Sequence, residues 1–202
     1  MEIINTIYSM SFDELNDVQK GQAYDIMRGI NEQDTTPYWS VMQCEDLKET
    51  LKEYGIDNAD IQWSGFSCQG DGASISTDNI QAEMFLRKVK AWSKFKPLHK
   101  FIIDDTLSLS VLRDTSRYCH EYCVTANVEV SYYVDCTKRQ EAAIEELQTF
   151  ITEFIRDKSR DLYRSLESEN EYHDTDNAIK EHIEANEYSF KVDSTGQVLD
   201  LA

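Results

Sequence analysis

The best local candidate for a metal site is the segment Cys119-His120-Glu121-Tyr122-Cys123, because its two thiols and its imidazole could bind zinc. The C-x3-C spacing differs from the usual spacing of zinc ligands, and no second pair of cysteines or histidines completes four ligands. A cysteine beside His120 also resembles a nucleophile with its base, but adjacent side chains point apart and no third group orients them. We therefore predict structural thiols, with no metal, no cofactor and no catalytic residue. A metal-dependent enzyme using these residues is the alternative.

The glycine-flanked turn 69–72 superficially resembles a phosphate-binding loop. No G-K-S/T follows it, and the net charge of the chain would repel phosphate. Asp71 between two glycines is typical of a turn, in which Asp bonds its own backbone. Trp63, Phe66 and Asp71 could still form a recognition surface, because such a loop lets a partner's backbone approach closely.

Charge is the strongest signal in this 202-residue chain. It contains 38 acidic and 20 basic residues, giving a formal charge of −18 and a pI near 4.5. This balance argues against direct binding to nucleic acid or anionic membranes. The charge is uneven along the chain: residues 1–80 carry −11, 81–103 carry +5, 104–140 carry −2 and 141–202 carry −10.

The most acidic stretch, residues 161–187, could imitate DNA. Duplex DNA carries one charge per 1.7 Å, so 18 charges correspond to about 30 Å of duplex, which is similar to the span of a domain of this size. A solvated acidic surface that keeps the protein soluble is the alternative. The carboxylates that we expect to bind a basic partner are Glu167, Glu169, Glu171, Asp174 and Asp176.

The basic segment 87–100 is the exception to this acidity. Its cations are Arg87, Lys88, Lys90, Lys94, Lys96 and Lys100. They could hold an acidic partner, pair with the protein's own carboxylates, or support self-association. The 38 available acids favour the last two uses.

Hydrophobic periodicity predicts the elements that position these segments. The expected strands are 3–8, a hairpin of 61–68 and 73–77, 125–134, and a closing hairpin of 188–192 and 198–201; the expected helices are 12–30, 40–54, 81–103, 107–120, 137–166 and 176–185. The order lacks a regular βαβ alternation, so we predict an α+β fold, an antiparallel sheet with several helices on one face, including a long helix near 137–166. Two prolines and seven glycines leave no flexible linker, which favours a single acidic domain over residues 1–202.

Cysteine usage and the N-terminus bear on the compartment. Five cysteines are an odd number and do not suggest a disulfide framework. The first residues lack the basic start and apolar run of a signal peptide, and no apolar stretch approaches about 20 residues. We therefore expect a cytoplasmic protein with no membrane partner.

Three strings resemble a widespread family of small bacteriophage proteins. Residues 8–17, Y-S-M-S-F-D-E-L-N-D, are similar to its "Y-x-F-D-E-L-S-D" opening. Residues 61–73, I-Q-W-S-G-F-S-C-Q-G-D-G-A, are similar to its "SGF-x-SQGDGA" core, and residues 181–190 to its "I-E-A-N-E-Y-x-F" ending. The chain departs from the pattern at Cys68, where serine is usual, and after Pro97.

The resemblance implies a phage origin, and hence the bacterial host cytoplasm, but carries over no catalytic residues. Some members of the family are labelled antitoxin-like. Our leading hypothesis is a non-enzymatic protein that inhibits or modulates a host nucleic-acid-handling or defence protein with a basic surface, with its carboxylates acting as a DNA mimic. The alternative is an antitoxin-like or regulatory module that binds a protein through the Trp63–Asp71 hairpin.

Overall fold

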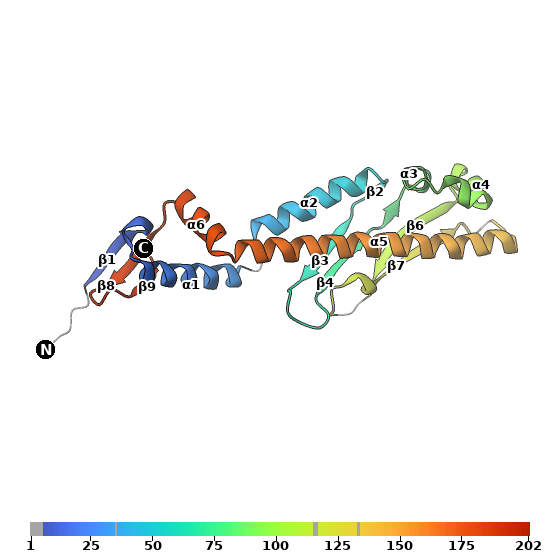
Figure 1. The fold of residues 1–202 in the computed structure, drawn as a ribbon. Coiled ribbons are helices and arrows are strands. Elements are labelled where there is room, and N and C mark those ends of the chain that lie inside the picture. Colours follow the sequence, from blue (N-terminus) through green and yellow to red (C-terminus); the bar gives the residue numbers. More distant parts are fainter. Residues whose placement is uncertain (1–5, 35, 115–116, 133) are drawn as a thin grey trace. The chain divides into compact units, whose positions relative to one another are not determined.

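The computed structural model describes residues 6–34, 36–114, 117–132 and 134–202, and it confirms the α+β class (Figure 1). The chain divides into two compact units. Unit 1 comprises residues 1–39 and 168–202, and unit 2 comprises residues 40–167. Residues 3–5 of the expected first strand lie outside the described residues. The single domain expected over residues 1–202 stays a prediction.

Unit 1 contains a three-stranded antiparallel sheet in the order β1-β8-β9. The β8–β9 pair confirms the predicted closing hairpin. The Glu14 carboxylate accepts the backbone N–H of Ser11 at 2.8 Å, and Asn16 caps α1 by accepting two backbone N–H bonds at 3.0 Å. The elements of unit 1 are β1 Ile7–Ser11, α1 Asp17–Gln33, α6 Asp176–Ala185, β8 Ser189–Asp193 and β9 Val198–Leu201.

The core of unit 1 lies between its sheet and its helices. Phe190 of β8 is fully buried, and its ring centroid lies 6.3 Å from that of Phe12. Lys191, which lies between the buried Phe190 and Val192 of β8, is exposed. The helices therefore cover one face of this sheet and leave the other to solvent. The buried apolar side chains are Phe12, Leu15, Ala23, Met27, Ile179, Ile183, Phe190, Val192 and Val198.

Unit 2 contains two larger antiparallel strand pairs, β3–β4 and β6–β7, and a short pair, β2–β5. A bridge joins the two larger pairs: Thr77 and Val111 exchange backbone hydrogen bonds of 3.1 and 2.8 Å. The strands of unit 2 are β2 Ile56–Asp57, β3 Asp60–Ser64, β4 Gly72–Ser76, β5 Asn79–Ile80, β6 Leu107–Arg113 and β7 Val124–Val130.

The helix predicted over residues 107–120 is wrong, because residues 107–113 form β6. Leu107, Leu109 and Val111 are buried and every second residue is more exposed, which is the period of a strand. The strand predicted over 125–134 is confirmed as β7, which covers residues 124–130 and has the same burial pattern as β6. The two strands pair in register, with Leu109 opposite Val128.

The long helix predicted over 137–166 is confirmed as α5, which continues to His173. Gly55, which follows α2, has a φ of +72°, the left-handed conformation in which helices commonly end at glycine. The helix expected over 81–103 is broken into α3, a 3₁₀ helix that contains Pro97, and α4. No helix in the described part of the chain, α5 included, is both long and apolar enough to cross a membrane. The helices are α2 Tyr38–Lys52, α3 Ala82–Lys88, the 3₁₀ helix Trp92–Leu98, α4 His99–Ile103 and α5 Lys138–His173.

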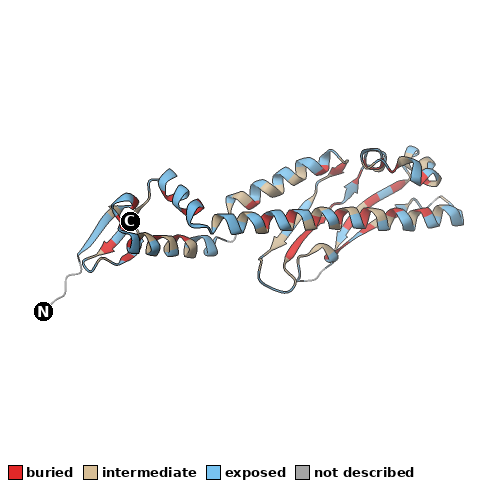
Figure 2. Ribbon diagram, viewed as in Figure 1, coloured by how far each residue is buried: buried red, intermediate tan, exposed pale blue. Residues whose placement is uncertain are grey.

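Helix α5 packs along the strands of unit 2 and protects their outer edge. Its buried residues Leu147, Ile151 and Ile155 belong to the same core as the inward-facing residues of β4, β6 and β7 (Figure 2). The backbone N–H of Ala126 in β7 donates to Thr152 Oγ1 at 3.0 Å. A side chain of α5 therefore satisfies a backbone donor of β7 that β6 does not reach, which limits unwanted strand pairing at this edge.

Candidate functional site

The negative charge is concentrated in unit 1. This unit has 16 acidic and four basic residues, a formal charge of −12 over 74 residues. Unit 2 has 22 acidic and 16 basic residues, a formal charge of −6 over 128 residues. The smaller unit thus carries two thirds of the net charge, which makes it the best candidate for contact with a basic partner.

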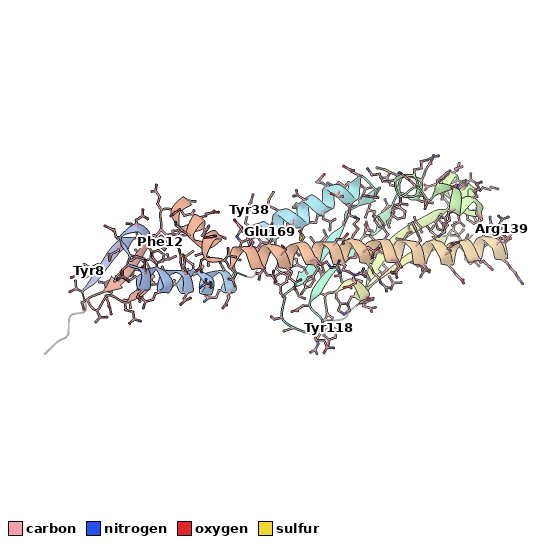
Figure 3. All side chains as sticks on the ribbon, viewed as in Figure 1. Tyr8, Phe12, Tyr38, Tyr118, Arg139 and Glu169 are labelled. Carbon is pink, nitrogen blue, oxygen red and sulfur yellow. The ribbon has the colours of Figure 1, made fainter. Side chains whose placement is uncertain are left out.

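The acidic stretch predicted from the sequence folds as the end of α5 and the whole of α6. Thr175 begins α6: its Oγ1 accepts the Ala178 N–H at 3.3 Å and donates to the Tyr172 carbonyl at 2.8 Å. Glu169 lies near the C-terminal end of α5 (Figure 3). The predicted residues Glu169, Glu171, Asp174 and Asp176 belong to unit 1, whereas Glu167 is the last residue of unit 2.

Two of these five carboxylates have partners inside unit 1. Asp176 forms an ion pair with Arg28, which also binds Asp25 at 3.0 Å. Glu169 lies 3.6 Å from the ring of His173. Among the described residues, the carboxylates of Glu171 and Asp174 are exposed and have no ion pair, although Arg28 Nε donates to the Asp174 backbone carbonyl at 3.3 Å. These two carboxylates are therefore the most available to a partner.

The carboxylates at the end of α5 do not all face one way. Glu167 and Glu171 are four residues apart and lie on the same side of the helix. Glu169 is rotated about 200° from Glu167, because each residue advances about 100° around a helix. The carboxylates of Glu167, Glu169 and Glu171 therefore do not form a single flat row on α5. The carboxylates of Glu171 and Asp174 are exposed and could contact a basic partner.

The predicted β3–β4 hairpin forms, but the loop that connects its strands spans residues 65–71 rather than the predicted turn 69–72. The Asp71 carboxylate accepts the Cys68 N–H at 2.6 Å, the Ser67 N–H at 3.0 Å and the Ser64 hydroxyl at 3.2 Å. These hydrogen bonds, led by that from Cys68, hold the pKa of Asp71 below its ordinary value. Asp71 therefore organises its own loop, as the turn interpretation predicts.

Replacing Asp71 should make loop stability less dependent on pH. Its folded pKa is depressed, so the ionised carboxylate stabilises the fold above the unfolded pKa and loses that effect as pH falls through the folded value. We expect Asp71→Asn to cost about 1 kcal/mol at pH 7, an amount limited by solvent screening, and much less near pH 2.5. Urea unfolding at both pH values measures this. Asp78→Asn, at an exposed position, is the control, and an equal cost at both pH values would contradict the account.

The aromatic side chains of the hairpin pack against α5. The Trp63 and Phe66 rings stack with centroids 5.5 Å apart, and Phe66 lies 5.5 Å from the Tyr163 ring. The Tyr163 hydroxyl donates to the Gly65 carbonyl at 2.9 Å. Trp63 and Phe66 are only partly exposed, and Asp71 is occupied by its own loop, so the hairpin offers less free recognition surface than its sequence suggested.

The segment 118–120 covers the hairpin loop, a contact that no local pattern predicted. A Cβ on Gly72 would lie 2.6 Å from His120 Cβ, and one on Gly70 would lie 2.2 Å from the Tyr118 ring. Tyr118 lies beside this loop in Figure 3. The two glycines flanking Asp71 were the available signal, because close approach of another segment is a reason for glycine. No feature of the sequence indicated that Tyr163 contacts Gly65, because the two residues are 98 positions apart.

The Cys119–Cys123 cluster is engaged in local contacts. Cys119 Sγ lies 3.4 Å from Ser74 Oγ, and burial raises the pKa of the Cys119 thiol. His120 Nδ1 accepts the Tyr122 N–H at 3.2 Å, and Cys123 is buried. Within the ranges that the structure describes, no three His, Cys, Asp or Glu side chains are arranged to hold a metal ion. This geometry gives no support to the metal-enzyme alternative.

The basic segment 87–100 is only partly neutralised. Arg87 pairs with Glu83, Lys88 with Glu53 and Lys94 with Glu146, at 2.7, 2.9 and 3.1 Å. The remaining three cations are exposed and have no carboxylate within 4 Å among the described residues. They are Lys90, Lys96 and Lys100. Internal pairing, predicted as one use of this segment, therefore accounts for half of its cations.

Fold and charge define an acidic α+β protein in which a small, strongly acidic unit accompanies a larger unit of lower charge density. The family model described as a domain of unknown function, DUF8835, matches residues 39–176, and the chain belongs to this family. The match begins within one residue of unit 2 and ends just inside α6, so β1, α1, β8 and β9 of the acidic unit lie outside it. No curated protein and no solved structure matches the chain.

Proposed function

We propose that this chain is a phage-encoded, non-enzymatic binding protein. In this proposal unit 1 binds the basic surface of a host protein that handles nucleic acid or acts in defence, in the bacterial cytoplasm, and thereby blocks the surface that would contact DNA or RNA. The observation that carries the proposal is the formal charge of −12 in a unit of 74 residues. The resemblance of residues 8–17, 61–73 and 181–190 to bacteriophage proteins supports the host context.

The arrangement of carboxylates favours electrostatic docking over a close copy of duplex DNA. The carboxylates of Glu171 and Asp174 are exposed and form no ion pair among the described residues, whereas the carboxylate of Asp176 is held by Arg28. Exposed charges steer association and fix orientation, and their contribution is strongly screened by salt. The complex should therefore form quickly at low ionic strength and weaken steeply as salt is added.

A pull-down from bacterial host lysate tests this proposal. The tagged protein is incubated with lysate at low salt, eluted with a salt gradient and analysed by mass spectrometry. We expect a basic nucleic-acid-handling or defence protein to elute at moderate salt. A four-site variant should capture it at least about tenfold less well, since each exposed ion pair contributes up to about 1 kcal/mol. This variant carries Glu169→Gln, Glu171→Gln, Asp174→Asn and Asp176→Asn, all of which lie in unit 1.

The matched control neutralises four exposed carboxylates of unit 2 and changes the net charge equally. Its substitutions are Asp78→Asn, Asp104→Asn, Glu141→Gln and Glu145→Gln. The control should retain the partner if unit 1 is the binding surface. Equal loss in both variants would attribute capture to net charge alone, and retention by the four-site variant would reject unit 1 as the site.

A further inference from the structure

Strand β1 is an outer strand of the sheet in unit 1. The strand order is β1-β8-β9, so β1 and β9 form the two edges (Figure 1). The edge of β9 is covered by α1, because the Val198 N–H donates to Gln22 Oε1 at 3.0 Å. In the turn before β9, the Gly196 carbonyl accepts Gln19 Nε2, also at 3.0 Å. Strand β1 pairs with β8 over residues 7–11, and this pairing uses its inner edge.

Alternate residues of β1 direct their backbone groups away from β8. Asp193 lies opposite Ile7, and its N–H donates to a carbonyl of the β8–β9 turn at 3.0 Å. Because Asp193 bonds on the β9 side, it forms a non-hydrogen-bonded pair with Ile7, whose N–H and C=O point outward. Ser9 and Ser11 follow at intervals of two and do the same, and the Ser11 N–H is held by the Glu14 carboxylate at 2.8 Å. No group of the described chain bonds the outward N–H and C=O of Ile7 and Ser9.

The side chains of β1 leave this edge unprotected. The strand reads Ile-Tyr-Ser-Met-Ser, with no charged residue and no proline, and its pairing with β8 contains no bulge. Ile7 and Tyr8 are each 54% exposed, and Tyr8 is marked in Figure 3. Lysine, proline and bulges are the usual means by which edge strands avoid pairing with other chains. Strand β1 uses none of them, so its edge is suited to pairing with another strand.

We propose that β1 pairs antiparallel with β1 of a second copy of this chain, in a register centred on Tyr8. In this register Ile7 of each copy lies opposite Ser9 of the other, and the two pairs exchange four hydrogen bonds, which satisfies every outward group of both residues. A register centred on Ser9 would instead place Ile7 opposite Ser11, whose N–H is already donated to Glu14. The two Tyr8 rings face each other in a non-hydrogen-bonded pair, where side chains approach most closely.

The dimer that results is closed and weak. Both copies use the same strand, so the contact is isologous and further copies cannot add to it. One five-residue strand from each copy contributes a smaller interface than the roughly 1,200 Å² of stable complexes. Each unit 1 carries a formal charge of −12, so the copies repel each other and salt should strengthen the dimer. Host binding should weaken with salt, so the two associations are distinguishable, and this inference does not depend on a host partner.

Sedimentation velocity of the purified full chain, from about 10 μM to about 1 mM protein and at about 50 and about 500 mM salt, tests self-association. We expect the average mass to rise with concentration toward that of two chains and no further, with tighter association at the higher salt. A monomer under all these conditions, or growth beyond a dimer, would overturn the proposal and would leave the proposed host function standing.

Amide hydrogen exchange at low and high protein concentration tests which strand pairs. The N–H groups of Tyr8 and Met10 bond to β8, so they should be protected at both concentrations. Those of Ile7 and Ser9 should become protected only where the dimer forms. A dimer in which Ile7 and Ser9 exchange as fast as in the monomer would show that β1 is not the interface.

Ser9→Pro removes an outward N–H from each copy, and therefore two of the four hydrogen bonds. Proline is tolerated in an edge strand where the N–H faces solvent, so unit 1 should still fold. We expect dimerisation at least about tenfold weaker than that of the wild type. Ser9→Ala is the matched control: it removes the hydroxyl but keeps the N–H, and it should dimerise like the wild type.

Tyr8→Glu is a second test that leaves the backbone unchanged. It places two carboxylates directly opposite each other, so dimerisation should again weaken at least about tenfold. Val18→Glu, at a 74% exposed position of α1, adds the same charge away from the strand and should dimerise like the wild type. Dimerisation of Ser9→Pro or Tyr8→Glu at wild-type strength would overturn the assignment. Circular dichroism of every variant establishes that loss of association does not reflect loss of folding.

Discussion

Phe85→Ala should destabilise unit 2 by about 3–5 kcal/mol, the usual cost of removing a buried aromatic ring. Phe85 is fully buried in α3, and its ring makes edge contacts with Phe154 at 5.1 Å and with Phe150 at 6.2 Å. Phe150 in turn lies 5.8 Å from Phe95. Truncation therefore leaves a cavity and removes two aromatic contacts that join α3 to α5.

Urea unfolding followed by circular dichroism measures this loss. Phe85→Leu should recover roughly half of it, because most of the apolar volume returns without the edge contacts. Met84→Ala, at a 41% exposed neighbouring position, should change the unfolding free energy by less than about 1 kcal/mol. A cost below about 1 kcal/mol for Phe85→Ala would mean that this ring does not lie in the core of unit 2.

Gly72→Ala should have the second largest effect, a destabilisation of about 2–3 kcal/mol. A Cβ at this position would lie 2.7 Å from His120 Cα and 2.8 Å from the Cys119 carbonyl oxygen. Both are backbone atoms, so the whole 119–120 segment must move, which is the costly form of overpacking. Hydrogen exchange should show faster exchange in residues 117–123 and in β4.

Gly21→Ala is the matched glycine control, with the opposite expected sign. Gly21 lies within α1, is exposed, and a Cβ there would have nothing within 4 Å. Alanine should therefore stabilise the chain by about 0.5–1 kcal/mol through its higher helix propensity. If both glycine substitutions were destabilising to a similar degree, the close approach of segment 119–120 to Gly72 would not be the cause.

Hydrophobic periodicity predicted most of the helices and strands, because each of them buries one face against a neighbouring layer of the fold. Helix α5 shows an apolar stripe at helical spacing, and β7 shows an alternation of period two, so both were identified. Strand β6 was missed although Leu107, Leu109 and Val111 alternate with more polar positions. Its leucines and serines have no strong strand preference, and only pairing with β7 makes this alternation decisive.

Only those features of the candidate sites that depend on residues close together in the sequence could be predicted. The turn role of Asp71 followed from its two glycine neighbours, and the structure provides its three donors. The cover over the loop by Tyr118 and His120 could not be inferred, because it brings together residues about 50 positions apart. The concentration of charge in unit 1 required the fold, since this unit is assembled from both ends of the chain.

The most direct test of the central claim, that unit 1 is an electrostatic docking surface, is the salt dependence of binding to the captured host protein. Isothermal titration calorimetry at several salt concentrations should show that the association constant of the wild type falls steeply with salt. The four-site variant should bind more weakly and with a shallower dependence, while the unit 2 control follows the wild type. Equal salt dependence for the wild type and the four-site variant would contradict the claim.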